Sequence, residues 1–269
     1  MRNYHFIRNR WYKINSFIKN MYLKYRKNFF SQNGEDGIIE KIIEDLNLSQ
    51  KLFVCEFGAW DGKFASNTFN LVIKKNSVAL MIEGDNEKYK DLVKTSKQYP
   101  NIIPVNKFVT PDGDNSLDKI LEKNNFPIDY DLLSIDIDSN DLEIWESATK
   151  YKPKIVIIEI NSSLLPDVRQ RHNAKIGLEG NSFQSTLDVA KRKGYSPIVH
   201  TGNLILLRNE LIDIINFDND LLKNPNKLFI YDWVNKNKEK NNIIIKLLKF
   251  FIPNFIRKKI SARFFKTIF

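Results

Sequence analysis

The feature that most constrains the fold is an alternation of short apolar runs with longer helix-compatible stretches. The apolar runs fall at residues 52–57, 78–82, 102–109, 131–137 and 154–160. One helix-compatible stretch lies between each run and the next, near 66–75, 86–97, 115–124 and 140–150. Strands that alternate with helices of this length form a parallel sheet covered by helices. Residues 184–193 predict one more helix, which ends at Gly194.

Two strand-like runs close the alternating region, at residues 195–200 and 203–208, and the pair Thr201-Gly202 separates them. This spacing predicts an antiparallel hairpin. The expected fold is therefore α/β, a doubly wound, Rossmann-like and mostly parallel sheet with a C-terminal antiparallel hairpin.

Charge divides the chain of 269 residues into three parts. Residues 1–30 carry eight Lys/Arg and no acid, and residues 243–269 carry seven Lys/Arg and no acid, so the rest of the chain holds 27 basic against 32 acidic residues. The net charge of +10 thus belongs to the ends. We expect a basic amphipathic N-terminal helix over 1–30, a Rossmann-like domain over 31–235, and a polar hinge with a cationic amphipathic tail over 236–269. An acidic middle does not resemble a nucleic-acid-binding surface, so no nucleic-acid partner is expected.

The basic ends show apolar residues at helical spacing, such as Ile7, Trp11 and Ile14 near the start and Ile244 and Leu247 near the end. Such helices pack on the core, assemble with partners, or bind an anionic membrane surface. The sequence shows no secretory signal and no apolar run long enough to span a bilayer. We expect a cytoplasmic protein whose ends can contact the inner face of a membrane.

The stretch at residues 52–62 predicts a buried strand that turns tightly into a helix. Gly58 and Gly62 follow Glu56, and such turns leave backbone N–H groups free for a ligand. Ligands of doubly wound sheets bind at the carboxyl ends of the strands. Glu83 ends the second strand about 20 residues after Gly62, the position of a carboxylate that accepts ribose hydroxyls. A dinucleotide fingerprint requires a glycine where Glu56 stands, so the pattern favours a ligand with an amino group.

Candidate catalytic residues follow the fourth and fifth strands. Asp136, Asp138 and Glu159 lie there, and a carboxylate can act as a general base toward a hydroxyl group. Asp136 and Asp138 fit helix capping around Asn140 equally well. Asp138 and Glu159 also offer the oxygen ligands that Mg²⁺ prefers. Cys55, the only cysteine, excludes an internal disulfide and a cysteine-cluster metal site.

Two polar loops flank this set. The loop at 166–173 places His172 beside Arg169 and Arg171, which suits an anionic acceptor or a solvated surface. The loop at 31–37 offers Ser31 or Asn33 as a helix cap and can also fold over a polar ligand.

Residues 31–37, 56–62, 132–141 and 183–195, taken in order, resemble the motifs of FkbM-like S-adenosylmethionine-dependent methyltransferases. These are Rossmann-fold enzymes often found in bacterial and viral glycan gene sets. The resemblance covers about residues 31–210 and leaves both basic ends uncovered. It implies a cofactor whose methionine part lies against the turn at 56–62, whose ribose meets Glu83 and whose adenine lies near residues 112–115. The expected cofactor contacts are Glu56, Gly58, Ala59, Asp61, Gly62, Glu83, Gly84 and Asp136.

The resemblance also implies an acceptor. We expect O-methylation of a sugar in a surface glycan or its lipid- or nucleotide-linked precursor, with Asp136, Asp138 and His172 as candidate catalytic residues. The expected acceptor contacts are Asn33, Glu159, Asn161, Arg169 and Arg171. Two alternatives stay open: a Rossmann-fold binding or scaffold protein without catalysis, and a methyltransferase that acts on a lipid or protein acceptor.

Overall fold

The computed structural model describes residues 20–48, 51–137 and 139–235. The chain divides into two compact units, Met1–Ile230 and Tyr231–Phe269, and the account below concerns the first. The predicted N-terminal helix over 1–30 lies outside the described residues up to residue 19, as do the hinge and tail over 236–269 and Asp138. Over residues 20–30 the structure has only the 3-10 helix Leu23–Tyr25 in place of the predicted α-helix.

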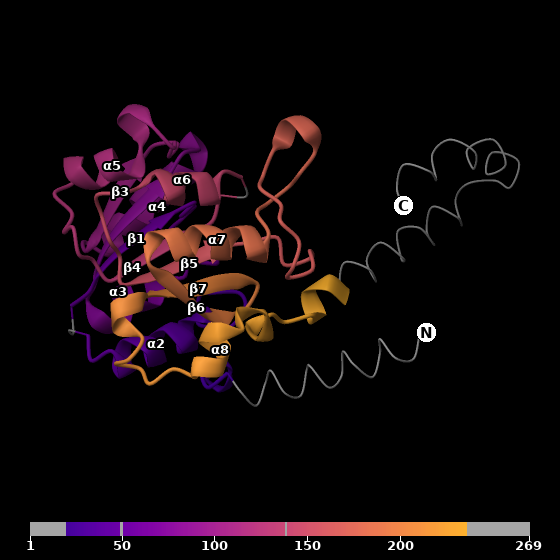
Figure 1. The fold of residues 1–269 in the computed structure, drawn as a ribbon. Helices are drawn as coiled ribbons and strands as arrows, with labels where there is room; N and C mark the ends of the chain where they lie inside the picture. The colour runs from indigo at the N-terminus through magenta and orange to yellow at the C-terminus, as the bar shows by residue number, and fades with distance from the viewer. Residues whose placement is uncertain (1–19, 49–50, 138, 236–269) are drawn as a thin grey trace, which may run out of the picture. The chain divides into compact units, whose positions relative to one another are not determined.

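Seven strands form one sheet in the order β3-β2-β1-β4-β5-β7-β6 (Figure 1). The first five strands pair in parallel, and β7 pairs antiparallel with both β5 and β6. This arrangement confirms the predicted mostly parallel sheet with an antiparallel pair at one edge. The strands are β1 (Phe53–Phe57), β2 (Val78–Glu83), β3 (Ile102–Asn106), β4 (Leu132–Ile135), β5 (Ile155–Glu159), β6 (Tyr195–His200) and β7 (Asn203–Arg208).

Helices cover both faces of the sheet because its central strands are apolar on both sides. One core cluster joins α2, α3, α4 and α8 to alternate residues of the strands, and α5, α6 and α7 lie on the other side (Figure 1). The helices are α2 (Glu35–Asp45), α3 (Phe69–Lys75), α4 (Asn86–Gln98), α5 (Leu117–Lys123), α6 (Asp141–Ser147), α7 (Phe183–Lys193) and α8 (Asn219–Lys223). Short 3-10 helices lie at Leu23–Tyr25, Gly113–Asn115, Ala174–Ile176, Asn209–Leu211 and Pro225–Leu228.

The order of the strands reverses at β1, because β2 lies on one side of it and β4 on the other. The helices that follow β1 and β4, α3 and α6, lie on opposite faces of the sheet, and ligands of such sheets bind at the switch point between these strands. Two expectations about this edge were wrong in detail. α3 begins only at Phe69, so residues 58–68 form an irregular loop and not a tight entry into a helix. β4 ends at Ile135, so Asp136 lies in a loop. β3 ends at Asn106, within the apolar run at 102–109, and Phe108 lies in the loop that follows.

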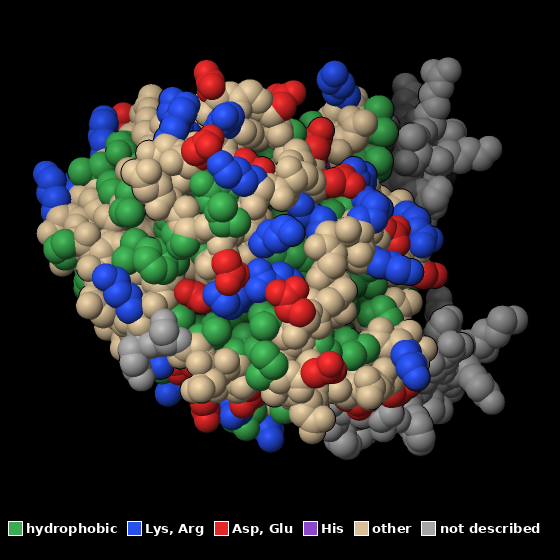
Figure 2. Space-filling view, turned by 60° about the vertical axis from the view of Figure 1, so that its left-hand side comes forward, with side chains coloured by type: hydrophobic (Ala, Val, Ile, Leu, Met, Phe, Trp, Pro, Cys, Tyr) green, Lys and Arg blue, Asp and Glu red, His purple; other side chains and the backbone are tan. Residues whose placement is uncertain are grey.

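Figure 2 shows one face of the molecule, on which Lys and Arg side chains lie beside Asp and Glu side chains and between hydrophobic ones. Ion pairs between such groups include that of Lys150 with Glu122, at 2.7 Å. Within the residues that the structure describes, no helix is long and apolar enough to cross a membrane.

Candidate active site

Glu56 is buried in β1 and holds the loop that enters α3. Its carboxylate accepts hydrogen bonds from Ser66 Oγ at 2.6 Å, from Thr68 Oγ1 at 2.6 Å and from the backbone N–H of Asn67 at 2.9 Å. Burial raises the pKa of Glu56, although the three donors act in the opposite direction. All three hydrogen-bond donors to Glu56 belong to the protein, so its predicted contact with the amino group of the cofactor stays a prediction.

The expectation that the turn after β1 leaves backbone N–H groups free is wrong for most of it. The N–H groups of Gly58 and Ala59 both donate to the carbonyl oxygen of Ile82 at 3.1 Å, and that of Gly62 donates to the carbonyl oxygen of Ala59 at 2.7 Å. The N–H of Trp60 donates to Glu83. A diphosphate would lack the backbone donors that usually cradle it in this kind of fold.

The two glycines are required by packing. Gly58 has φ +82°, and a Cβ added there would lie 1.7 Å from the carbonyl oxygen of Asp136. Gly62 has φ +76°, and a Cβ there would lie 2.8 Å from Leu92 Cδ1. The absence of a side chain at Gly58 thus lets the loops after β1 and β4 meet at the switch point. Asp61 Oδ1 accepts the backbone N–H groups of Lys63 at 2.9 Å and of Phe64 at 2.8 Å.

Glu83 ends β2 at the same edge of the sheet. Its Oε2 accepts the Trp60 N–H at 2.9 Å, and its Oε1 accepts the Asp85 N–H at 2.8 Å. Each carboxylate oxygen has a second lone pair, so the group that holds both loops can still accept ribose hydroxyls. Its position at the end of the strand beside β1 fits the predicted role, which stays a prediction.

Exposed aromatic rings lie on the loops next to Glu83, and the sequence analysis did not single them out. Phe108 is 70% exposed, and its ring lies so close to Gly84 that a Cβ there would be 2.3 Å from Phe108 Cδ1. Trp60 contacts Phe64 edge to face, with 5.4 Å between ring centroids, and Lys88 lies over the Trp60 ring. Phe108 could have been found from the sequence, because it is a large apolar residue in a polar loop directly after a strand.

Asp136 follows β4 and is partly exposed at this edge. Capping of the next turn is done by Asp141, which accepts the N–H groups of Ile137 at 2.8 Å and of Ser139 at 2.9 Å. Asn140 makes no side-chain cap. Asp138, the other predicted catalytic acid, lies outside the described residues.

The loop at 31–37 folds back on the preceding segment through two buried acids. Asp36 Oδ2 accepts the N–H groups of Phe29, Phe30 and Ser31 at 2.7 to 2.8 Å. Glu35 accepts from Thr201 Oγ1 at 2.6 Å, which ties this loop to the β6–β7 turn, and from the Asn33 N–H at 2.7 Å. Among the described residues, Oδ1 of Asp36 is buried and has no hydrogen-bond partner.

The segment 29–32 lies against the segment 61–65 that follows β1, and a pocket of about 430 Å³ lies between the two segments. Phe29, Ser31 and Gln32 line one side of this pocket, and Asp61, Lys63 and Phe64 line the other. Phe29 and Phe64 expose 40% and 64% of their surface. Of the predicted acceptor residues, Asn33 belongs to the loop at 31–37.

The other predicted acceptor residues lie on or beside a protruding arm between β5 and α7 (Figure 1). Asn161 Nδ2 donates to the carbonyl oxygen of Glu179 at 2.9 Å and so closes the base of the arm. Arg169 pairs with Asp188 of α7 at 2.9 Å, and Arg171 pairs with Glu146 of α6. Both guanidinium groups thus have protein partners, and their contact with an acceptor stays a prediction.

His172 also takes part in the arm's own structure. The backbone N–H of His172 donates to Asn181 Oδ1 at 3.0 Å, and the ring Nδ1 accepts the backbone N–H of Gly180 at 3.3 Å. Glu159 ends β5 at the base of the arm and is partly exposed. No group of three or more His, Cys, Asp or Glu side chains in the described ranges could hold a metal ion; the proposed Mg²⁺ ligand Asp138 is outside these ranges.

The residues of this edge fit a ligand with hydroxyl groups and positive charge better than one with phosphates. Most of the turn donors are occupied, and Glu83 and Asp136 bring carboxylates to the ends of β2 and β4, the two strands that flank β1. Such groups accept hydrogen bonds and stabilise cations. S-adenosylmethionine has ribose hydroxyls, an ammonium group and a sulfonium, so these residues fit it.

No protein-family profile matches the chain, and no curated protein matches it. Among solved structures, it is similar to a Staphylococcus aureus protein provisionally named a caffeoyl-CoA O-methyltransferase, with 18% identity over 66% of this chain and 84% of that one and a TM-score of 0.44. It is also similar to a SAM-dependent methyltransferase from Aquifex aeolicus (12% identity, 63% and 88% covered, TM-score 0.38). TrmK of M. capricolum, solved with S-adenosylhomocysteine, gives 16% identity, 83% and 92% covered, and a TM-score of 0.41. Each TM-score is below 0.5, so the proposal below depends on this chain's own residues.

Proposed function

We propose that this protein is an S-adenosylmethionine-dependent methyltransferase. The observation that carries the proposal is the chemistry of the switch point, where the turn after β1 has few backbone donors left and Glu83 presents a fixed carboxylate. A cofactor with hydroxyls and positive charge matches this site, and a dinucleotide does not. When bound, S-adenosylmethionine supplies a methyl group on a sulfonium sulfur.

The chain's own residues then have separable tasks. Glu83 would accept the ribose hydroxyls, and the exposed ring of Phe108 beside Gly84 would stack on the adenine. Asp136, which is partly exposed after β4, would act as the general base and accept the proton of the acceptor hydroxyl. Asp138 is a second candidate for that task on sequence grounds.

Calorimetry with S-adenosylhomocysteine tests the cofactor assignment. Removing the charged acceptor in Glu83→Gln is expected to weaken binding roughly 10- to 100-fold, the value of a hydrogen bond to a charged group. Glu87→Gln, an exposed residue in the first turn of α4, is the matched control and should bind as the wild type does. Absence of binding by the wild-type protein, or equal binding by Glu83→Gln, would overturn the assignment.

For the acceptor, we propose a sugar of a surface glycan or of its precursor. The pocket between the 29–32 loop and the 61–65 segment supports this choice, because Phe29 and Phe64 offer apolar rings while Gln32, Asp61 and Lys63 offer hydrogen-bonding groups. A sugar presents apolar ring faces and hydroxyls, which need this mixture of partners.

Transfer of a labelled methyl group to glycan, lipid and protein fractions tests the acceptor class. The expected result is labelling of the glycan fraction, with a raised KM for Phe64→Ala and unchanged S-adenosylhomocysteine binding. Labelling confined to lipid or protein would refute the sugar, and cofactor binding without any transfer would favour a non-catalytic binding protein.

The basic ends lead to a separate proposal, that they hold a cytoplasmic enzyme against an anionic membrane surface. Flotation with vesicles that contain phosphatidylserine tests it. The full chain should float with them and a chain lacking residues 243–269 should not; equal flotation would refute the proposal.

A further inference from the structure

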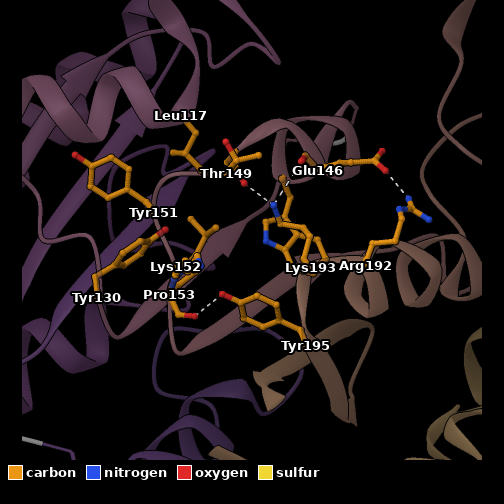
Figure 3. A pocket seen from close by; sticks show the side chains of 13 residues that line it. Leu117, Tyr130, Glu146, Thr149, Tyr151, Lys152, Pro153, Arg192, Lys193 and Tyr195 are labelled. Atoms are coloured by element: carbon orange, nitrogen blue, oxygen red, sulfur yellow. Dashed lines mark hydrogen bonds and ion pairs between the residues drawn. The ribbon is translucent and has the colours of Figure 1, made fainter. Parts of the chain in front are cut away.

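A second pocket lies at the amino edge of the sheet, where β4, β5 and β6 begin. It has a volume of about 330 Å³ and is lined by aromatic and basic side chains (Figure 3). Tyr130 precedes β4, Pro153 precedes β5 and Tyr195 opens β6. Because the candidate active site lies at the carboxyl ends of the strands, this pocket is at the opposite edge of the sheet.

The walls of the pocket are aromatic. Trp145 of α6 and Tyr195 meet edge to face, with ring centroids 5.5 Å apart, and Tyr130 and Tyr151 complete the ring-lined part. All four side chains are at least nine-tenths buried. Rings in such arrangements favour a flat apolar ligand, which can pack in offset or edge-to-face contact.

One wall carries a buried hydroxyl that lacks a partner. Tyr130 is 1% exposed, and its Oη has no hydrogen-bond partner among the described residues. Figure 3 shows this hydroxyl directed inward, whereas the hydroxyl of Tyr195 donates to the carbonyl oxygen of Pro153 at 2.6 Å. A buried hydroxyl without a partner is costly, so Tyr130 Oη indicates a polar group that the pocket receives.

The charge of the pocket is positive. Lys193, at the end of α7, donates from Nζ to the carbonyl oxygens of Glu146 and Ala148. The carboxylates of Asp118 and Glu146 also act on its charge, and that of Asp118 accepts the backbone N–H groups of Thr149 and Lys150. Burial lowers the pKa of Lys193, so an anionic group beside it would stabilise the ammonium. The carboxylate of Glu146 is already paired with Arg192 and Arg171 outside the aromatic walls.

We propose that this pocket binds a small aromatic carboxylate, with the flat ring between Trp145 and Tyr130 and the carboxylate received by the Tyr130 hydroxyl and the Lys193 ammonium. The volume is at the lower end of the range for small-molecule sites, which limits the ligand to one or two fused rings. The site is independent of the proposed methyl transfer, because a ligand at the amino edge is not a reactant at the carboxyl edge.

Titration calorimetry of the full chain with 2-naphthoate tests the proposal, with 2-naphthamide as the neutral analogue. Binding of the carboxylate is expected, and the amide should bind about tenfold or more weakly because it loses the charge-assisted contacts. Tyr130→Phe should weaken 2-naphthoate about tenfold while preserving the ring. Tyr99→Phe, on the opposite face of the sheet, and Lys191→Met, exposed on α7 near Lys193, should bind as the wild type does.

A crystal structure with 2-naphthoate then locates the ligand. Density between Trp145 and Tyr130 supports the proposal. It is overturned if 2-naphthoate does not bind, if Tyr130→Phe and Lys193→Met bind it as tightly as the wild type, or if the pocket holds only ordered water hydrogen-bonded to Tyr130 Oη.

Discussion

Acidification should destabilise this protein through one buried histidine. His200 ends β6 with no exposed surface, and its Nδ1 accepts the N–H of Ile230 at 2.9 Å. That bond places the ring proton on Nε2, which lies 2.8 Å from Ser162 Oγ, and Ser162 donates onward to the carbonyl oxygen of Gly202 at 2.7 Å. The Phe229 ring stacks on the imidazole, with centroids 4.6 Å apart. The contact at Nδ1 therefore requires the neutral form of the ring, because a protonated Nδ1 cannot accept the Ile230 N–H.

The magnitude follows from the pKa of the ring. Burial, helped by the positive charge of Arg26, lowers the pKa of His200 from 6.5 to about 3. Below pH 6.5 the unfolded chain binds a proton that the folded chain does not, so the free energy of unfolding falls as pH falls, until the folded pKa is reached. Between pH 8 and pH 5.5 the loss amounts to about 1.4 kcal/mol.

Urea unfolding followed by circular dichroism at pH 8 and pH 5.5 measures this loss. His200→Gln keeps an acceptor and a donor in the ring's place but cannot titrate, so it should lower stability at pH 8 and remove most of the pH dependence. His172→Gln on the arm is the control and should keep the wild-type dependence. The reasoning fails if the wild-type free energy does not change between the two pH values, or if His200→Gln changes as much as the wild type.

Three further changes separate packing from catalysis at the candidate active site. Gly58→Ala combines a positive φ with a Cβ 1.7 Å from a carbonyl oxygen, so it should lower the free energy of unfolding by about 3 kcal/mol or more in the urea titration. Its control is Gly177→Ala, where φ is +72° and the space around the added Cβ is open, and this variant should lose only about 1 kcal/mol. Asp136→Asn should abolish methyl transfer in the labelling assay while S-adenosylhomocysteine still binds in calorimetry. Phe108→Ala should weaken that binding about tenfold without altering stability, because its ring is 70% exposed.

The sequence was sufficient for the fold because the periodicity of the apolar residues reflects burial directly. Both strands of the closing pair, Tyr195–His200 and Asn203–Arg208, have the predicted bounds, and α7 ends at Gly194 in the left-handed conformation. Errors arose where a strand ends before its apolar run does. β4 stops at Ile135, and Asp141 holds the turn that follows by accepting the N–H groups of Ile137 and Ser139.

The candidate site was predictable in position but not in its internal contacts. Glu83 ends β2 as expected, and Asp136 directly follows β4, because the apolar runs locate the strands and the polar residues that come after them. Which protein groups a carboxylate accepts depends on loop geometry, which periodicity does not encode. The same holds outside the candidate site for the buried His200, whose Nδ1 accepts the N–H of Ile230, a residue 30 positions further along the chain.

The acids around this edge share a task that the sequence pattern could not reveal, which is to hold loops through backbone N–H groups. Asp36 is the most heavily engaged, because one of its oxygens accepts three N–H groups of the 29–31 segment. Its other oxygen is buried without a partner among the described residues. Asp36 could therefore serve the loop alone, or the loop and a cationic part of the ligand.

Two substitutions at Asp36 distinguish these roles. Asn keeps an oxygen for the three N–H groups and places an amide nitrogen at the unpartnered position, whereas Ala leaves three buried donors without an acceptor. If Asp36 serves the loop alone, Asp36→Ala should lower the free energy of unfolding by about 3 kcal/mol or more and Asp36→Asn by about 1 kcal/mol, with S-adenosylhomocysteine affinity changing in the same order. We expect this result, because hydrogen bonding to three donors already accounts for a buried charge. A large loss of affinity in Asp36→Asn with unchanged stability would contradict it and would make Asp36 a ligand-binding residue.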